Sequence, residues 1–296
     1  MNLQEYSNEL AQVVELVSKS VVRVDARHRV AGTGIAWSND GVILTADHVV
    51  EREENIHVTL GDGSELAAEL VGRDPATDIA ALRVKGVSLT PVALAPLAGL
   101  RVGHLVIAVG KPWDNEIVVS AGVVSSLSRG RQRGPFRDGL VQTDAVMLPG
   151  FSGGPLVDAS GRIVGMNSSV LGRGASLAIP HETAARVVSQ LLKEGRVKRG
   201  YLGVGVQIVP IAESLAQKLG LKQEAGQMIL TIESGAPAEK AGLLPGDILV
   251  ALNGDSLEHT HELHRWLAAD RADQSVKAQV IRGGELQALT VTIGTR

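Results

Sequence analysis

The sequence predicts a mainly β protein in which a large unit of short strands is followed by a smaller unit of mixed strands and helices. From Val21 to Ile179, short β-branched runs are separated by glycine, aspartate and asparagine, a pattern typical of an all-β barrel or sandwich. After residue 199, strand-like runs enclose two helical patterns. Glycine supplies 34 residues and aromatic side chains only 2 %, which favours tight turns and aliphatic strands.

The composition limits the possible functions. The content of 44 % hydrophobic and 21 % charged residues is normal for a globular protein. The formal net charge of −3, without a block of like charges, gives no indication of a nucleic-acid surface. Because the chain has no cysteine, disulfides and thiolate chemistry are excluded. No apolar run approaches the roughly 18 residues that a membrane helix needs, and the N-terminus has no signal-peptide pattern. We therefore expect a cytosolic protein or a mature or truncated form.

The first unit is expected to begin with a helix, because apolar residues from Leu3 to Val17 recur at helical spacing. This N-terminal helical segment, residues 1–19, either covers its own core or makes an oligomer contact. The strands are expected in residues 21–26, 32–37, 41–46, 55–60, 78–84, 105–110, 117–127, 161–170 and 175–180. A helix in residues 181–195 ends at Gly195. The basic link "RVKRG" after it separates a domain of residues 1–197 from one of residues 200–296.

The second unit contains a histidine pattern that resembles a zinc motif. Strands are expected in residues 201–208, 227–233, 247–254, 275–281 and 286–293, and helices in residues 212–220 and 259–269. His261 and His264 in "HTHELH" lie one residue too close for H-E-x-x-H, and no third ligand follows. We expect a solvated helix surface here, with no metal site and no cofactor.

Ser152 in "PGFSGGPLVD" fits G-x-S-x-G, the nucleophile elbow of lipases and esterases. An elbow needs a helix directly after the serine, whereas Ser152 is followed by two glycines, a proline and the hairpin pattern "LVDASGRIVGM". The elbow is therefore rejected.

A serine nucleophile also needs a histidine base and an acid that orients it. Among the histidines before Ser152, His48 follows the end of the buried strand "GVILTA", where a rigid strand can hold it facing a cleft. Asp78 directly precedes the apolar run "IAALRV", at the buried edge of a strand, whereas Asp74 before Pro75 is typical of a turn. Each residue alone is more often structural, but the order His48, Asp78, Ser152 in a β-rich region predicts a triad.

With these motifs in place, the sequence resembles the HtrA (high-temperature-requirement) serine proteases over nearly its whole length. The resemblance depends on "GTGIAWSNDGVILTADHVV", "DPATDIAALRV", "GLVQTDAVMLPGFSGGPLVD", "GRIVGMNSS", "SLAIP" and "RGYLGV". It implies a trypsin-like double β-barrel protease domain followed by a small α+β PDZ domain. It also implies that His48 is the general base, Asp78 the orienting acid and Ser152 the nucleophile.

The same resemblance assigns further residues of the protease domain. The backbone amides of Gly150 and Ser152 would form the oxyanion hole. Leu177, Ala178 and Ile179 would line an aliphatic specificity pocket, which predicts cleavage after small or medium aliphatic residues. The family usually has asparagine where this chain has Phe151. That phenylalanine would either shape the leaving-group side of the cleft or mark a loop at rest in an inactive arrangement.

In the second unit, "GYLGV" resembles the carboxylate-binding loop of a PDZ domain. Backbone amides of Tyr201, Leu202, Gly203 and Val204 can cradle a terminal carboxylate, and the next strand edge can pair with an extended peptide. The helix with "ELHRWLAA" would form the far wall of the groove, with Leu263, Trp266 and Leu267 as its apolar residues. A purely structural α+β domain is the alternative.

The resemblance implies an ATP-independent serine endopeptidase of protein quality control that cleaves unfolded or damaged proteins. C-terminal peptides would bind the PDZ domain and guide or regulate it, and the N-terminal segment would form a homotrimer. An extracytoplasmic location, such as the periplasm or cell envelope, is implied by the family alone. The alternatives are a chaperone-like binder with little proteolysis and an adaptor in which the PDZ domain dominates.

Overall fold

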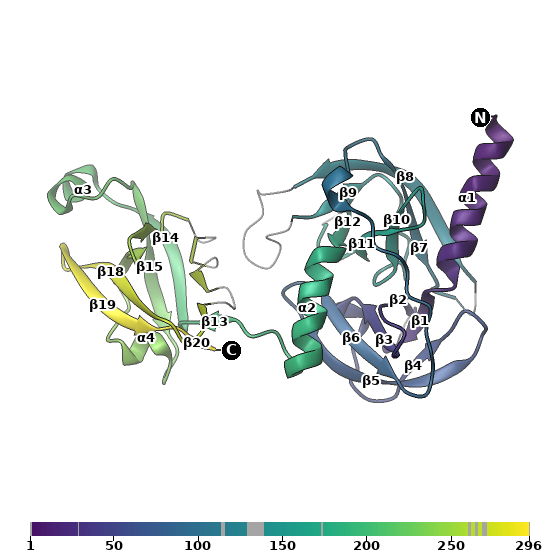
Figure 1. Cartoon of the computed structure of the whole chain (residues 1–296). Coiled ribbons are helices and arrows are strands. Elements are labelled where there is room, and N and C mark those ends of the chain that lie inside the picture. Colours follow the sequence, from purple (N-terminus) through teal and green to yellow (C-terminus); the bar gives the residue numbers. More distant parts are fainter. Residues whose placement is uncertain are drawn as a thin grey trace. The chain divides into compact units, whose positions relative to one another are not determined.

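The computed structural model in Figure 1 describes residues 2–28, 30–113, 116–128, 139–172, 174–259, 262–263, 266–267 and 271–295. The chain forms two compact units: the first ends at Val197, and the main segment of the second begins at Lys198. Strands predominate in both units, which confirms the mainly β fold class. Within these residues, every helix is too short or too polar to cross a membrane.

The first unit consists of two closed antiparallel barrels. The first barrel contains β1 (Val21–Asp25), β2 (Gly32–Ala36), β3 (Val42–Thr45), β4 (Ile56–Thr59), β5 (Glu65–Asp74) and β6 (Ile79–Val84). The second contains β7 (Leu105–Gly110), β8 (Val118–Leu127), β9 (Val141–Thr143), β10 (Pro155–Asp158), β11 (Ile163–Ser168) and β12 (Ser176–Pro180). Pairing of β1 with β4 and of β7 with β10 closes the two sheets. The short 3₁₀ helices η1 (Asp47–Val49) and η2 (Leu97–Gly99) lie in connections.

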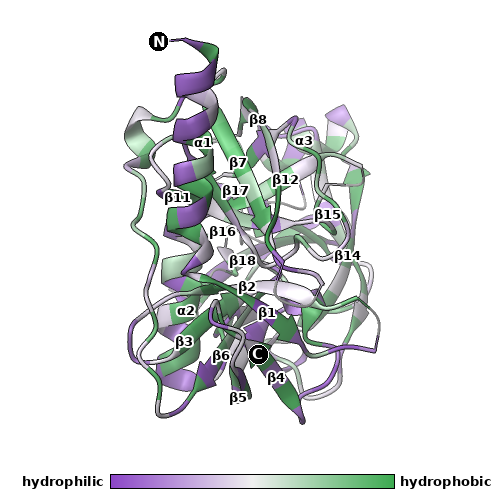
Figure 2. Ribbon diagram, turned by 90° about the vertical axis from the view of Figure 1, so that its right-hand side faces the viewer, coloured by the Kyte–Doolittle hydropathy of each residue, from purple (hydrophilic) through white to green (hydrophobic). Residues whose placement is uncertain are grey.

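The barrels are held together by an aliphatic core. All four residues of β3 are buried, as are the first four of β6, because both strands face packed neighbours on each side. Helix α2 (His181–Glu194) adds Val187, Val188 and Leu191 to the same cluster and lies against β5 and β6. In Figure 2, β7 is one of the strongly hydrophobic strands. The loop that follows β3 and the loop that precedes β6 are therefore each attached to a strand that the core holds in place.

Two strands have no counterpart among the expected elements. β5 is rich in alanine and glutamate, which have low β-propensity, yet it pairs along its length with β4 and β6. Closure of the barrel supplies backbone partners on both sides and outweighs the local preference. β9 is only three residues long and pairs with β8 and β12.

Helix α1 (Leu3–Ser18) confirms the expected N-terminal helix. Asn2 and Glu5 form a capping box at its start. Only Val17 is buried, while Leu3 and Leu16 are 84 % and 57 % exposed. Figure 2 shows hydrophobic and hydrophilic patches alternating along this helix. Its C-terminal half thus packs on its own unit, and exposed apolar surface remains along its length.

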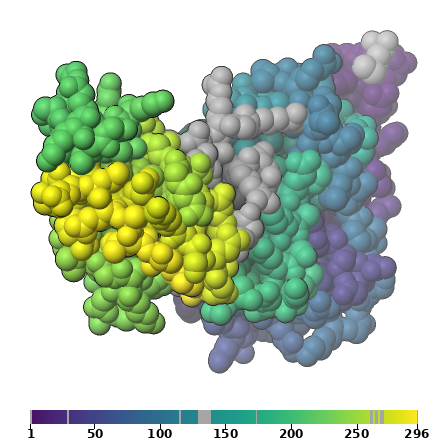
Figure 3. Space-filling view, turned by 60° about the vertical axis from the view of Figure 1, so that its left-hand side comes forward, coloured from purple at the N-terminus to yellow at the C-terminus, as the bar shows by residue number. Residues whose placement is uncertain are grey.

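The second unit consists of antiparallel strands with short helices. Its elements are β13 (Gly200–Tyr201), β14 (Val204–Pro210), α3 (Glu213–Leu219), β15 (Ala225–Ile232), α4 (Pro237–Lys240), β16 (Ile248–Leu252), β17 (Asp255–Ser256), β18 (Ser275–Arg282), β19 (Glu285–Thr292) and β20 (Gly294–Thr295). The main sheet has the order β14-β15-β16-β18-β19, and β13 pairs with β20. β18 and β19 contribute to the yellow surface in Figure 3.

A buried ion pair ties two parts of this unit together. Asp247 is 2 % exposed, and its two carboxylate oxygens each lie 2.7 Å from a guanidinium nitrogen of Arg282. Burial alone raises the pKa of Asp247, but hydrogen bonds from Arg282 and from the Leu244 amide outweigh burial and hold this pKa below its usual value. The charged carboxylate is therefore more stable in the folded unit than in the unfolded chain.

We expect this pair to make the second unit sensitive to acid. Because the folded pKa of Asp247 is depressed, its contribution to stability is complete above the unfolded value of about 3.9 and is lost as pH falls through the folded pKa. Thermal unfolding measured between pH 7 and pH 2 should show a smaller acid-dependent loss in Asp247→Asn, which is less stable at pH 7. The exposed Asp255→Asn is the control. Parallel pH curves for Asp247→Asn and the native chain would contradict the assignment.

Candidate active site

His48 and Asp78 lie together at the end of the first barrel. His48 is in η1, directly after β3, and Asp78 immediately precedes β6. The His48 Nδ1 atom is 2.8 Å from Asp78 Oδ1 and 3.0 Å from Oδ2, and the His48 backbone N–H donates to Oδ1 over 3.1 Å. An ionised carboxylate only accepts hydrogen bonds, so Nδ1 carries the proton and Nε2 is left as an acceptor.

The Asp78 carboxylate is enclosed and fully engaged. It is 3 % exposed, and the hydroxyl of Ser168, at the end of β11 in the second barrel, donates to its Oδ2 over 2.5 Å. Asp78 has a positive φ of 55°, a conformation that aspartate tolerates better than most residues. This turn aims the carboxylate at His48 instead of along β6. Ser168 therefore joins the pair to the second barrel.

Ser152 is supplied by the second barrel, three residues before β10. The strand that follows it and the return strand β11 form the expected hairpin, so the elbow is excluded by structure as well as by pattern. The Ser152 Oγ atom is 2.9 Å from Ser169 Oγ and accepts from the Ser169 N–H over 3.3 Å. None of the hydrogen bonds between described residues joins Ser152 to His48. Ser168 and Ser169 thus contact the acid and the candidate nucleophile, respectively.

The loop before Ser152 leaves two backbone donors available. The Phe151 N–H donates to the Leu148 carbonyl over 3.1 Å, and Gly150 has φ +89°, as at the third position of a type II turn. Gly153 has φ +87°, and a Cβ there would lie 2.1 Å from the Thr33 carbonyl oxygen. In the described part of the chain, the amides of Gly150 and Ser152 donate to no protein acceptor.

The expectation that Phe151 shapes the leaving-group side of the cleft is wrong. Phe151 is 0 % exposed and packs in the core of the second barrel with Val106, Ala108 and Leu156. Its ring occupies the space beside Gly110, where an added Cβ would come within 2.5 Å of Phe151 Cδ1. The side chain therefore anchors the serine loop to the interior of the second barrel and presents no surface to a substrate.

The residues expected in the specificity pocket lie on β12. Ala178 and Ile179 are 0 % exposed and belong to the barrel cores. Leu177 is half-buried and pairs with Ser168 across the sheet. The aliphatic pocket therefore stays a prediction, with Leu177 as the only one of the three that is partly exposed.

In the second unit, the loop expected to bind carboxylate connects β13 and β14. Leu202 is buried in the core at 1 % exposure, and Tyr201 and Val204 are partly exposed. Gly203 has φ +75°, and its carbonyl accepts from the Glu233 N–H over 2.9 Å. The Tyr201 hydroxyl donates to the Glu233 carboxylate. The Gly203 carbonyl and the Tyr201 hydroxyl thus hold this loop against Glu233, and its binding of a carboxylate stays a prediction.

Of the residues expected in the far wall of the groove, Leu263 and Trp266 are buried in the core at 3 % and 5 % exposure. The Leu267 carbonyl accepts from the Gly200 N–H over 2.9 Å and so joins this segment to β13. Their contact with a peptide stays a prediction. His261 and His264 lie outside the described residues.

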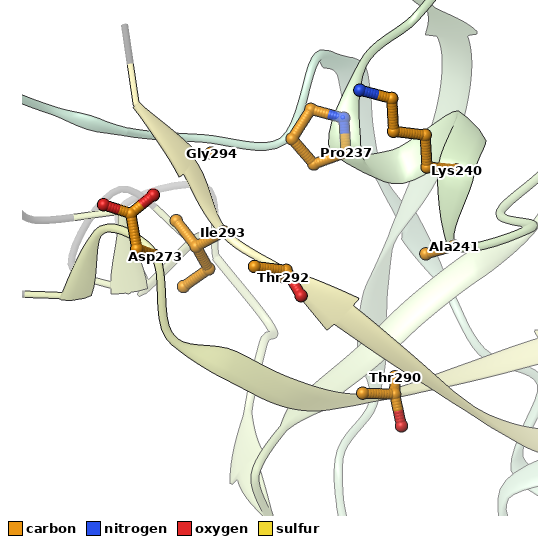
Figure 4. Close-up of a pocket in the computed structure, with 8 residues that line it drawn as sticks. All are labelled: Pro237, Lys240, Ala241, Asp273, Thr290, Thr292, Ile293 and Gly294. Atoms are coloured by element: carbon orange, nitrogen blue, oxygen red, sulfur yellow. The ribbon is translucent and has the colours of Figure 1, made fainter.

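A pocket in the second unit lies apart from these residues. It has a volume of about 330 Å³ and is formed by α4, β19, β20 and the turn at Asp273. Figure 4 shows Lys240 and Asp273 on opposite sides of it. The lining residues are Pro237, Lys240, Ala241, Asp273, Thr290, Thr292, Ile293 and Gly294. None of the residues expected to bind peptide is among them.

Two six-stranded barrels, with a histidine–aspartate pair from one and a serine from the other, define a trypsin-like serine peptidase. Comparisons with known proteins agree with this class of protein. Residues 32–166 match the trypsin-like peptidase domain, and residues 200–293 match the PDZ domain. The chain is 39 % identical over 270 residues to a probable periplasmic serine endoprotease DegP-like of Marinomonas sp., covering 90 % of this chain and 57 % of the relative. It therefore spans little more than half the length of that protein.

Solved structures resemble the chain over nearly its full length. The HtrA-type protease AlgW with a decapeptide has a TM-score of 0.78 and 30 % identity, with 98 % of both chains covered. A serine endoprotease from Yersinia pestis has a TM-score of 0.79 and 29 % identity, with 97 % of both chains covered. The chain belongs to the HtrA family of serine endoproteases.

Proposed function

We propose that this protein cleaves peptide bonds through an acyl-enzyme on Ser152, without ATP, metal or cofactor. His48 Nε2 removes the proton from Ser152 Oγ as the hydroxyl attacks the substrate carbonyl, and Asp78 stabilises the imidazolium that forms. The amides of Gly150 and Ser152 stabilise the oxyanion. The observation that carries this proposal is the His48 Nδ1–Asp78 contact of 2.8 Å, which leaves Nε2 as the acceptor.

The proposed substrates are unfolded or damaged proteins, cleaved after small or medium aliphatic residues. C-terminal peptides would bind the second unit through the Tyr201–Val204 loop, pair with the edge of β14 and regulate the protease. A relative solved with a decapeptide supports peptide binding. The exposed apolar residues of α1 support assembly into a homotrimer, and relatives named periplasmic support an extracytoplasmic location.

A fluorophosphonate probe tests the proposed chemistry. The native chain should be labelled, and casein cleavage should rise when C-terminal peptides are added. Ser152→Ala should remove both signals, while Ser160→Ala, on the exposed hairpin turn, should retain them. A native chain that stays unlabelled even with peptides present would favour the alternative, a chaperone-like or PDZ-mediated peptide binder with little proteolysis.

The contact between Ser152 and Ser169 has a consequence for reactivity. Ser169→Ala should raise the rate of fluorophosphonate labelling about 2- to 10-fold, because loss of a hydrogen bond with a net free energy of about 0.5–1.5 kcal/mol frees Oγ for His48. Ser168→Ala should instead lower this rate, since Asp78 loses a donor. The measurement is the second-order labelling constant at pH 7.5. A slower Ser169→Ala would show that Ser169 supports the reaction.

A further inference from the structure

Thr33, in β2, contacts the serine loop through its hydroxyl and its backbone N–H. The residue is 0 % exposed. Its hydroxyl donates to the Gly150 carbonyl over 2.6 Å and accepts from the Lys111 N–H over 2.8 Å. Its backbone N–H donates to the Ser152 carbonyl over 3.1 Å. The hydroxyl and the N–H of one buried residue thus make three hydrogen bonds.

The fourth contact links Thr33 to the strand that carries His48. The Thr45 hydroxyl donates to the Thr33 carbonyl over 2.7 Å, and Thr45 is the last residue of β3, three residues before His48. The first barrel therefore holds both the candidate base and the candidate nucleophile through one residue. Lys111, the other partner, is 1 % exposed, and its Nζ donates to the Leu60 carbonyl, so it is itself fixed.

These contacts determine the direction of one peptide plane. The Gly150–Phe151 peptide is held at its oxygen by Thr33 Oγ1 and at its N–H by the Leu148 carbonyl. Glycine is the most freely rotating residue, so without these contacts Gly150 has several accessible conformations. With them, its φ of +89° is retained and its own N–H has no acceptor among the described residues. An oxyanion hole needs a donor that is oriented in advance.

We propose that the Thr33 hydroxyl is a positioning group for catalysis, which holds the Gly150 amide in the orientation that stabilises the oxyanion. Among the described residues, Thr33 contacts the carbonyls of Gly150 and Ser152 and forms no hydrogen bond with Ser152 Oγ or the His48 ring. The inference rests on the proposed function, because it assigns a task to the oxyanion hole of that reaction. It predicts an effect on turnover that exceeds any effect on substrate binding.

The test compares Thr33→Val, which keeps the shape but lacks the hydroxyl, with Thr33→Ser, which keeps the hydroxyl. Full-length variants are assayed on a fluorogenic peptide with valine before the scissile bond, with an activating C-terminal peptide present. Thr33→Val should lower kcat by about 10²-fold, the lower end of the loss seen when one oxyanion donor is removed, with KM changed less than about 3-fold. Thr33→Ser should restore most of kcat.

Thr143→Val is the matched control, because Thr143 is a buried threonine of the second barrel whose hydroxyl, within the part of the chain that the structure describes, accepts from the nearby Ala145 amide and from no other group. It should leave kcat unchanged. A second readout is the affinity for a peptide boronate, which should fall in parallel with kcat. If Thr33→Val does not fold, Thr33→Cys takes its place, since its thiol is slightly larger than the hydroxyl of Thr33→Ser but is a poor donor.

Two results would overturn the inference. One is an unchanged kcat in folded Thr33→Val or Thr33→Cys. The other is a loss of kcat in Thr33→Ser as large as that in Thr33→Val, which would assign the effect to packing of the methyl group. In either case, the proposed function would still stand if the probe labels the native chain and Ser152→Ala removes this labelling. Absence of labelling in the native chain would instead remove the proposed function, and the inference with it.

Discussion

Replacing Asp78 by asparagine should lower kcat/KM about 10⁴-fold, as the same exchange does in trypsin-like triads. An amide presents an N–H group where the carboxylate only accepts, and His48 Nδ1 then loses the partner that fixes its tautomer. The His48 N–H and the Ser168 hydroxyl contact different carboxylate oxygens, but asparagine keeps one oxygen and a hydroxyl can accept from the amide NH₂ as well as donate, so the fold should persist. Initial rates on a fluorogenic peptide, corrected for unfolded protein, measure the effect.

Asp74→Asn is the matched control for this experiment. Asp74 is also buried, lies four residues earlier and accepts a hydrogen bond from the Thr77 hydroxyl. It should retain most of the activity per folded molecule. Equal losses in both variants would show that the charge of this turn, and not the contact between Asp78 and His48, supports the reaction.

Replacing Phe151 by alanine should lower the free energy of unfolding of the first unit by about 3–5 kcal/mol, the usual cost of truncating a buried aromatic residue. The ring fills the space beside Gly110 and is fully enclosed in the second barrel. Activity should fall as well, because the residue lies between Gly150 and Ser152 and its loss frees the loop. Urea unfolding of the full chain, followed by circular dichroism, measures the change.

Phe151→Leu and Phe151→Asn separate packing from chemistry. Leucine keeps most of the apolar volume, so Phe151→Leu should lower the free energy of unfolding clearly less than Phe151→Ala does. Asparagine is the residue that the family usually has. Phe151→Asn should lower the free energy of unfolding at least as much as Phe151→Ala, because its amide would be buried beside Gly110 without a partner. An asparagine variant with native stability and raised activity would show that Phe151 acts on the cleft.

Much of the fold was predictable because the pattern is local. Runs such as "GVILTA" and "DIAALRV" combine β-branched residues with flanking turn residues, and both form buried strands. The helix that ends at Gly195 was also predictable, because its apolar face and its left-handed terminal glycine both leave a signal in the sequence. β5 was not, since its alanines and glutamates favour no strand until β4 and β6 pair with it.

The partners of the candidate triad were harder to predict. Ser168 and Ser169 are adjacent in a sequence that reads only as the end of a strand, yet Ser168 contacts Asp78 of the first barrel and Ser169 contacts Ser152 within the second barrel. Successive residues in a strand point to opposite faces, but the sequence does not say what lies on either face. Thr33 likewise looks like any strand residue, and its role depends on contacts more than a hundred positions away.

The order of His48, Asp78 and Ser152, the alternation of strand and turn, and the change of pattern after residue 197 could all be read from the amino-acid sequence. These are local consequences of residue type, propensity and spacing. The burial of Phe151, the contact between Ser152 and Ser169, and the hydrogen bond from Thr33 to the Gly150 carbonyl became apparent with the folded chain. Those outcomes depend on how two closed barrels pack, because burial and hydrogen bonding between distant residues are set by the whole fold.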